Sequence, residues 1–241
     1  MSRALPSVAP RRWLLACAAS SEGHAIARAF EPGAEAPRIQ WKAVQIDSHL
    51  DLLVTGVGKA NAAAAVARAL DPARHAGVIN LGICGMLPKS RLKIGDIVLA
   101  SRSIYADEGV QTPQGFLDIA RQKFPPNQGL PGAGRIDAPI SNSLLTALTP
   151  LAVRVAPIAT VSTCSGRNRL ALSVVQRTGS AAEAMEGAAI GFAVLRIAHE
   201  CAAELAFAEL RIVSNTTGNR ARQRWDLAGS LARLGELAAR L

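Results

Sequence analysis

Short apolar runs that end in glycine or in small polar residues recur along the chain and predict a series of buried β-strands. The segments predicted as strands are 11–17, 40–46, 52–55, 78–81, 97–100, 153–163 with an interruption at Pro157, and 208–213. Glycine lacks the Cβ that would block an approaching ligand. In α/β enzymes the catalytic and binding residues lie at the ends of strands. We therefore expect residues at the ends of several of these strands to line one site.

Stretches rich in Ala, Leu and Ile separate the strands and predict helices. The predicted helices are 23–30, 58–70, 143–148 and 225–240, the last with leucines at 227, 231, 234, 237 and 241 on one face. The segment 181–204 should contain the longest internal helix. The order strand, helix, strand across 52–81 predicts a right-handed parallel crossover. Residues 121–140 are rich in proline and glycine and predict a long irregular loop, our candidate for a lid over the site.

Length and composition favour a single domain over 1–241, since 241 residues with 49% hydrophobic content can bury one substantial core. The net charge of +9 raises the question of a nucleic-acid or membrane partner. The arginines are scattered and aromatics make up only 4%, so we expect no nucleic-acid partner. No stretch approaches the ~20 apolar residues of a membrane span, so we expect no membrane partner.

Cysteine and histidine spacing gives no sign of a disulfide framework or a metal site. The four cysteines stand far apart without a CxxC spacing, which favours free thiols in a reducing compartment. Residues 11–17 imitate an export signal, but their apolar run is shorter than the roughly 7–15 residues of a signal core. A first strand explains them better, and we predict a cytoplasmic protein. The four histidines have no metal-ligand spacing, and no metal is predicted.

Three polar residues are candidates for chemistry. Glu22 follows the first strand, Glu186 lies among small residues, and Asn215 follows the last predicted strand. Each also has a structural explanation, because a glutamate at a helix start complements the helix dipole and an asparagine caps a turn. The pair Gly56 and Gly58 suits close backbone approach to a ligand, although tight packing explains it equally well. The residues alone leave both interpretations open.

Taken together, motifs along nearly the whole chain resemble the nucleoside phosphorylase and nucleosidase superfamily, and in particular its futalosine hydrolase family. The matching segments are Thr55 to Ala63, Asn80 to Gly85, Lys93 to Val98, Asp107 to Gly109, Val161 to Thr163, Met185 to Ala189, and Arg211 to Asn215 with Arg220 and Trp225. The resemblance implies a three-layer α/β/α sandwich around a central mixed sheet. It also implies a small-molecule nucleoside substrate, no cofactor and a homo-oligomer.

The resemblance assigns roles to individual residues. Glu186 matches the glutamate that holds the ribose hydroxyls, Met185 the methionine that packs on the sugar, and Glu22 the carboxylate that orients and deprotonates water. Gly82 and Thr163 match further substrate-binding positions. These roles fit the cleavage of an N-ribosidic bond, whose transition state carries positive charge on the sugar.

Two positions, Asn80 and Asn215, indicate which of the superfamily's reactions to expect. Asn80 stands where phosphorylases of the superfamily carry an arginine, and without fixed cations a phosphate nucleophile has no strong site, so water is expected instead. Asn215 stands where methylthioadenosine and S-adenosylhomocysteine nucleosidases carry the aspartate that protonates adenine N7. An asparagine cannot be that acid, but its amide can donate to N7 or O6, so we expect hypoxanthine to be the leaving base.

Other functions stay open at this point. Within the same fold, an adenine nucleosidase or a purine nucleoside phosphorylase would differ in leaving base and in phosphate dependence. A nucleoside-binding protein without catalysis and a basic surface that binds nucleic acid are the alternatives outside it. Arg220, Arg222 or Arg224 could pair with the carboxylate of the futalosine 5′ substituent, although a solvated segment explains these arginines as well.

Overall fold

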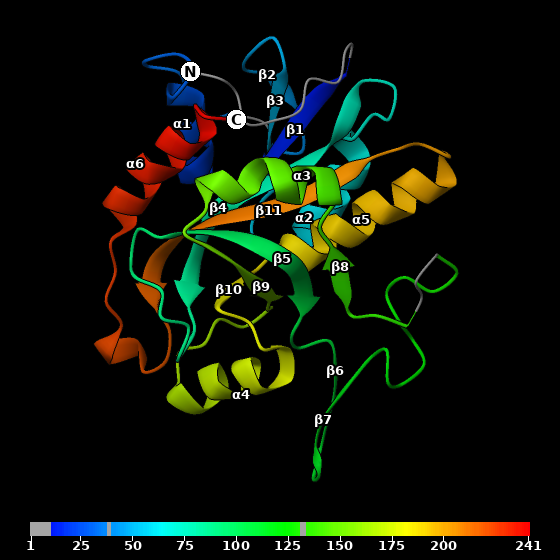
Figure 1. The fold of residues 1–241 in the computed structure, drawn as a ribbon, viewed down its shortest axis with the longest axis vertical. Helices are drawn as coiled ribbons and strands as arrows, with labels where there is room; N and C mark the ends of the chain where they lie inside the picture. The colour runs from blue at the N-terminus through cyan, green and yellow to red at the C-terminus, as the bar shows by residue number, and fades with distance from the viewer. Residues whose placement is uncertain (1–10, 38–39, 131–133) are drawn as a thin grey trace.

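Two long parallel strands, β4 (His75–Met86) and β11 (Ala206–Thr216), form the centre of a mixed sheet (Figure 1). The computed structural model describes residues 11–37, 40–130 and 134–241. The other strands of this sheet are β1 (Arg12–Cys17), β2 (Val44–Gln45), β3 (Leu50–Val54), β5 (Ile97–Tyr105), β8 (Asp137–Pro139), β9 (Arg154–Thr160) and β10 (Ala182–Ala184). Their order is β10-β9-β5-β11-β4-β1-β3-β2, with β8 beside β5.

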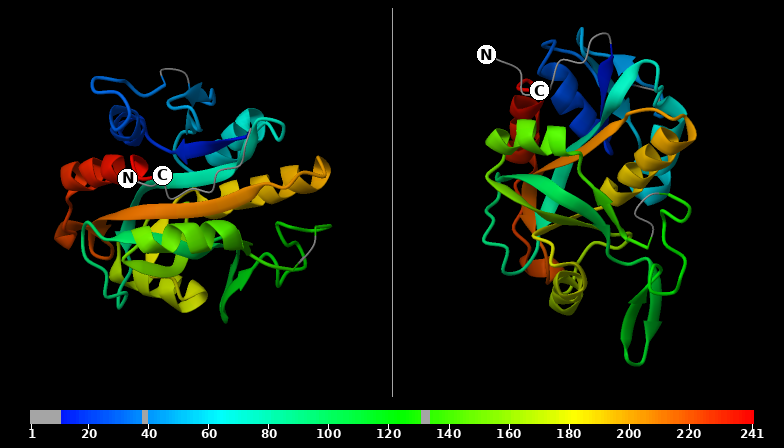
Figure 2. Two further views of the ribbon diagram at one scale, coloured as in Figure 1. Left: turned by 45° about the horizontal axis from the view of Figure 1, so that its top comes forward. Right: turned by 45° about the vertical axis from the view of Figure 1, so that its right-hand side comes forward.

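Helices cover both faces of the sheet. They are α1 (Ser20–Arg28), α2 (Lys59–Ala69), α3 (Asn142–Leu148), α4 (Asn168–Thr178), α5 (Gly187–Glu200) and α6 (Leu227–Ala238). Helices α1 and α6 pack together on one face, and α2 and α5 on the other (Figure 2). This confirms the predicted three-layer α/β/α architecture. No helix in the described ranges has the length and apolar character needed to cross a membrane.

Apolar side chains from all three layers make the main core. Leu15 of β1 lies between Leu52 of β3 and Ile79 of β4, and all three are fully buried. Helix α2 connects β3 to β4. These two strands are parallel and lie on either side of β1. Burying one side chain of this size contributes about 1.5–3 kcal/mol to the stability of the fold. A strand that is apolar on both faces gains this stability only where helices cover both faces of the sheet.

One side of the sheet closes on itself. Strand β10 pairs in parallel with β9 and also in antiparallel with β4. A second, smaller apolar cluster that includes Leu87, Ala159 and Val174 lies beside this closure. The hairpin of β6 (Gly109–Thr112) and β7 (Gly115–Asp118) projects away from the rest of the molecule near α4 (Figure 1).

Several strands are longer than the apolar pattern predicts. Strand β4 runs through Gly82 and Gly85 to Met86, so these glycines lie inside a strand and not in a turn after it. Strand β11 likewise includes Asn215, which pairs with Gly85 and bridges to Trp225. Pairing with neighbouring strands satisfies the backbone of these segments despite their glycines. Conversely, the strand predicted over 40–46 is reduced to the two residues of β2.

Tertiary pairing sets other element boundaries. The longest helix expected within 181–204 is α5, and it begins only at Gly187 because Ala182–Ala184 pairs with β9 and β4 as β10. Helix α4 and the β6–β7 hairpin have no counterpart among the predicted elements. In α6, Leu234 and Leu237 are buried as expected, but Leu227 is 48% exposed. The segment 121–140 contains turns and β8, and 131–133 of this candidate lid lie outside the described residues.

Candidate active site

The carboxyl ends of β1, β3, β4 and β11 meet at one edge of the sheet. Ala16 lies opposite Asn80, and Gly82 lies opposite Arg211 in the neighbouring strand. Parallel strands bring their carboxyl ends together, so residues far apart in sequence gather here. This edge holds most of the residues that the sequence analysis selected.

Glu22 points back from the first turn of α1 into the sheet edge. Its Oε2 accepts hydrogen bonds from the backbone N–H groups of Ala18 and Ala19, each at 2.9 Å, and its Oε1 accepts one from Ile83 at 2.9 Å. The side chain is 4% exposed. Burial raises the pKa of the Glu22 carboxyl above its ordinary value, and the positive charge of Arg211 opposes that rise. The result is a fixed carboxylate of increased basicity.

Arg211 is the centre of charge in this cluster. Its Nε donates to Oε1 of Glu209 at 2.8 Å and its Nη2 donates to Oε2 of Glu186 at 3.2 Å. The guanidinium is 1% exposed. Ser103 donates to the other oxygen of Glu209. A buried cation of this kind is stable only because carboxylates compensate it.

Glu186 precedes α5 and is held from two sides. Besides the ion pair with Arg211, its Oε1 accepts a hydrogen bond from the backbone N–H of Gly58 at 3.1 Å. The next residue, Gly187, has no side chain, and a Cβ there would collide with the carboxylate of Glu209. The small residues after Glu186 therefore let two buried carboxylates lie close to one arginine.

Gly82 makes room for the catalytic candidates. A Cβ at this position would lie 2.6 Å from Oε1 of Glu22 and 2.6 Å from Nη1 of Arg211, so both charged groups approach across the glycine. The neighbouring Asn80 is buried and oriented to donate to the carbonyl of Ala16 at 3.2 Å and to accept from Arg211 Nη2 at 2.6 Å. Glu22, Gly82 and Glu186 are thus brought together around Arg211.

Asn215 lies nearby on β11, at the wall of a cavity of about 290 Å³. Its Oδ1 accepts from the Ser214 hydroxyl at 2.9 Å, and its Nδ2 donates to the carbonyl of Thr216 at 3.0 Å. The amide keeps one further N–H for a ligand. The residues that line the cavity are Gly85, Cys164, Ser165, Gly166, Glu183, Asn215, Arg220, Gln223 and Trp225.

The other two predicted residues lie at the border of this group. Met185 is half-buried between β10 and Glu186 and packs against the smaller apolar cluster. Thr163 is exposed in the loop after β9, one residue before Cys164, which lines the cavity. Thr163 therefore lies beside the cavity but is not among its lining residues.

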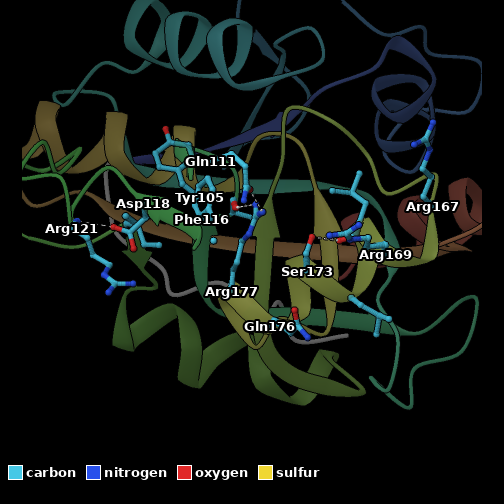
Figure 3. Close-up of a pocket in the computed structure, with 15 residues that line it drawn as sticks. Tyr105, Gln111, Phe116, Asp118, Arg121, Arg167, Arg169, Ser173, Gln176 and Arg177 are labelled. Carbon is cyan, nitrogen blue, oxygen red and sulfur yellow. Dashed lines mark hydrogen bonds between the residues drawn. The ribbon is translucent and has the colours of Figure 1, made fainter. Parts of the chain in front are cut away.

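A larger groove of about 1270 Å³ lies elsewhere, between the β6–β7 hairpin and α4 (Figure 3). Arg121, Arg167, Arg169 and Arg177 contribute to its walls, and Arg177 stacks over Phe116 at 4.0 Å. None of the residues selected from the sequence lines it. Cavity size alone would favour this groove, whereas the buried charges favour the cluster around Arg211 as the candidate site.

The sequence analysis missed the charges that organise the site. Glu209 and Arg211 lie inside an otherwise apolar strand, and Glu183 lies among alanines. Fully buried charged residues are rare unless they are paired, so a charge inside such a strand was the available signal. Among the described residues, no group of three or more His, Cys, Asp or Glu side chains could hold a metal ion.

Comparisons with known proteins show the family to which the chain belongs. The model of the phosphorylase superfamily matches residues 48–241. The chain is 36% identical to a futalosine hydrolase of Acidothermus cellulolyticus, over 95% of this chain and 89% of that protein. It is 35% identical to a futalosine hydrolase of Streptomyces coelicolor, over 95% and 94% of the two chains.

Solved structures share the fold at lower identity. A futalosine hydrolase mutant of Helicobacter pylori has a TM-score of 0.68 at 17% identity, covering 95% of this chain and 98% of that one. The methylthioadenosine/S-adenosylhomocysteine nucleosidase of Neisseria meningitidis, in complex with methylthio-immucillin-A, has a TM-score of 0.71 at 20% identity, covering 95% and 97%. The resemblance drawn from the motifs is confirmed. The chain belongs to the phosphorylase superfamily and, within it, to the futalosine hydrolase family.

Proposed function

We propose that this protein hydrolyses the N-ribosidic bond of futalosine and releases hypoxanthine and dehypoxanthine futalosine, as a step of menaquinone biosynthesis. The observation that carries the proposal is the buried Glu22–Arg211–Glu186 cluster beside a cavity whose wall holds Asn215 in place of an acid. The futalosine hydrolases at 35–36% identity support the same substrate.

The arrangement suits attack by water. Glu22 orients a water molecule and accepts one of its protons as the oxygen attacks C1′. The bond from C1′ to N9 breaks and its electron pair moves to the purine. The sugar gains the hydroxyl group of water, and hypoxanthine gains the proton that passes through Glu22.

The remaining residues stabilise the charges that develop. Glu186 binds the ribose hydroxyls, and its negative charge lies near the cationic sugar. Arg211 holds this carboxylate in place and compensates the cluster when the site is empty. Asn215 donates its free N–H to the purine as negative charge develops there, and Met185 packs against the sugar. The reaction proposed for these residues needs no cofactor.

Phosphorolysis fits the cluster less well. The one arginine at its centre already pairs with Glu186 and Glu209, and Asn80 is engaged with Arg211 and with a backbone carbonyl. A phosphate ion would therefore meet carboxylates and no uncompensated cation. A purine nucleoside phosphorylase remains the alternative that phosphate dependence would reveal, and an adenine nucleosidase the one that the leaving base would reveal.

The position of Arg220 bears on the 5′ substituent. Arg220 lines the cavity beside Asn215, whereas Arg222 and Arg224 are exposed outside it. The base and the 5′ substituent leave the ribose at different carbons, C1′ and C4′, which lie on either side of the ring oxygen. Under this proposal Arg220 lies at the base end, and the 5′ carboxylate binds elsewhere.

We further propose a single nucleosidase domain that works in the cytoplasm as a homo-oligomer. The four free cysteines suit a reducing compartment. Exposed Val57, next to Gly58 and the Ala-rich α2, is the suggested subunit contact near the site.

The test is chromatography of the purified protein incubated with futalosine, inosine, methylthioadenosine and aminodeoxyfutalosine, each with and without phosphate. Hypoxanthine released from futalosine alone, at the same rate without phosphate, is the expected result. Adenine release or phosphate dependence would establish one of the alternatives within the fold. No release from any nucleoside, with binding retained, would point to a nucleoside-binding protein.

A further inference from the structure

Gly85 of β4 separates two buried polar side chains on neighbouring strands. Glu183 of β10 lies opposite Gly85 on one side, and Asn215 of β11 lies opposite it on the other. Residues directly opposite each other project from the same face of a sheet, and neighbouring strands lie about 4.8 Å apart. Gly85 therefore lies between a carboxylate and an amide, and the part of a cavity that these three residues line is called the slot below.

This slot is part of the cavity beside the catalytic cluster. Gly85, Glu183 and Asn215 all line the cavity of about 290 Å³. A Cβ on Gly85 would lie 2.8 Å from Cγ2 of Thr217 and 3.1 Å from Nδ2 of Asn215, so both side chains approach the glycine backbone closely. A planar base lying on Gly85 would meet Asn215 at one edge and Glu183 at another.

Glu183 is held as a hydrogen-bond acceptor. Its Oε1 accepts from the backbone N–H of Ser165 at 2.7 Å, and its Oε2 accepts from the Ser165 hydroxyl at 2.6 Å. The residue is 4% exposed. Both bonds orient the carboxylate, and each oxygen keeps a lone pair for a further donor. The reaction proposed above makes no use of this buried acid.

We propose that Glu183 is a specificity residue that accepts a hydrogen bond from N1–H of a 6-oxopurine whose N7 and O6 face Asn215. This inference rests on the proposed function and names the group that completes base recognition. Hypoxanthine presents a donor at N1 and acceptors at O6 and N7, which complement a carboxylate and an amide N–H. Adenine in the same pose would direct the lone pair of N1 at the carboxylate and its amino group at the amide donor.

The test compares Glu183→Gln with the unaltered protein. Glutamine keeps an oxygen for Ser165 but can also donate to N1 of adenine. Because a hydrogen bond to a charged group is worth ~1.5–3 kcal/mol, we expect hypoxanthine to bind roughly 10- to 100-fold more weakly. Adenine should bind as well as before or better. Calorimetric Kd values for both free bases, and kcat/KM for their nucleosides, measure the change in preference.

Two further variants separate recognition from a merely structural role. Ser165→Ala removes one hydrogen bond to Glu183 but keeps the carboxylate, so it should leave the preference for hypoxanthine over adenine unchanged. Gly85→Ala keeps both polar groups but crowds Thr217 and Asn215 at the wall of the slot, and should weaken both bases together. If Glu183→Gln and Ser165→Ala weaken both bases alike, Glu183 only anchors the Ser165 loop and the inference is wrong.

The outcomes also separate this inference from the proposed function. If the unaltered protein releases hypoxanthine from futalosine and Glu183→Gln keeps its preference between the bases, the function stands and the inference fails. If the unaltered protein cleaves no 6-oxopurine nucleoside, the function fails. The base Kd values then decide the inference, which is overturned when hypoxanthine is not bound or when Glu183→Gln leaves its affinity unchanged.

Discussion

Arg211 donates a 3.2 Å hydrogen bond to the Glu186 carboxylate, and both side chains are almost fully buried. Glu209 holds the same guanidinium through its Nε. One cation therefore compensates two buried carboxylates in a place from which water is excluded. Losing one member of such a group leaves the others uncompensated.

Replacing Arg211 by methionine should lower both activity and stability. Breaking a buried ion pair costs about 3–5 kcal/mol, so we expect a decrease of that size in the free energy of unfolding, measured with urea. The control is Arg196→Met, because Arg196 lies 4.0 Å from Glu200 in an exposed pair. Exposed helix pairs are worth about 0.3–0.5 kcal/mol. An equally small effect at Arg211 would contradict its central place in the cluster.

Replacing Glu22 by glutamine should remove the base while keeping the size and shape of the side chain. General base catalysis contributes roughly 10²- to 10⁴-fold, so kcat should fall by that factor while circular dichroism stays unchanged. Glu31→Gln, at an exposed position, is the matched control. Retained activity in Glu22→Gln would assign the base to another group.

The pH profile provides a second measurement of Glu22. Only the ionised carboxylate accepts a proton, and burial raises its pKa above the ordinary glutamate value. Activity should therefore be full at high pH and lost as the pH falls through this raised pKa. The acid limb of kcat should lie above the pH expected for an exposed glutamate, ~4.3. An acid limb at or below that pH would contradict the assignment.

Replacing Asn215 by aspartate should shift the preference toward adenine nucleosides. A carboxyl group can protonate N7 of a leaving adenine, whereas the amide can only donate a hydrogen bond. The measurement is the ratio of kcat/KM values for adenine and hypoxanthine nucleosides. Asn219→Asp, which keeps the acceptor for the Ala221 N–H at an exposed position, is the control. Unchanged selectivity in Asn215→Asp would exclude Asn215 from base recognition.

Far from the site, Asp51 should govern stability in acid. It is buried and accepts hydrogen bonds from Arg12 at 2.8 Å, Arg74 at 2.7 Å and His75 at 3.1 Å. Burial alone would raise the pKa of Asp51, but the hydrogen bonds from Arg74, His75 and Arg12 outweigh it and hold the pKa below its ordinary value. A lowered pKa stabilises the fold above the unfolded value, ~3.9, and this stabilisation is lost as the pH falls below it.

Asp51→Asn should therefore cost about 1.5–3 kcal/mol at neutral pH, since it removes the charge from hydrogen bonds to Arg12 and to Arg74, which is half exposed. The loss of stability between neutral pH and pH 3 should also become smaller in this variant. Urea unfolding at several pH values measures both effects. Asp118→Asn, in the β7 hairpin strand away from this network, is the control. Parallel pH profiles for Asp51→Asn and the unaltered protein would contradict the role of Asp51.

Local patterns in the sequence determined the fold class, the family and the order of most elements. Apolar runs such as Leu52 to Val54 favour burial in the core, and the alanines of the α2 segment favour a helix. Motifs around Glu186 and Asn215 could be recognised because the residues of each lie close together in the chain. These features depend on neighbours in sequence.

Only the tertiary structure decided how the charges combine. Glu183, Glu209 and Arg211 meet distant partners, which are Ser165, Ser103 and Glu186, only when the strands pair and the segments between them fold. The same pairing makes 182–184 a strand where its alanines favour a helix, since hydrogen bonds to two neighbouring strands outweigh a weak helix propensity. A site assembled across strands depends on distances that no local pattern contains, so its ion pairs and its slot over Gly85 emerge only when the sheet is formed.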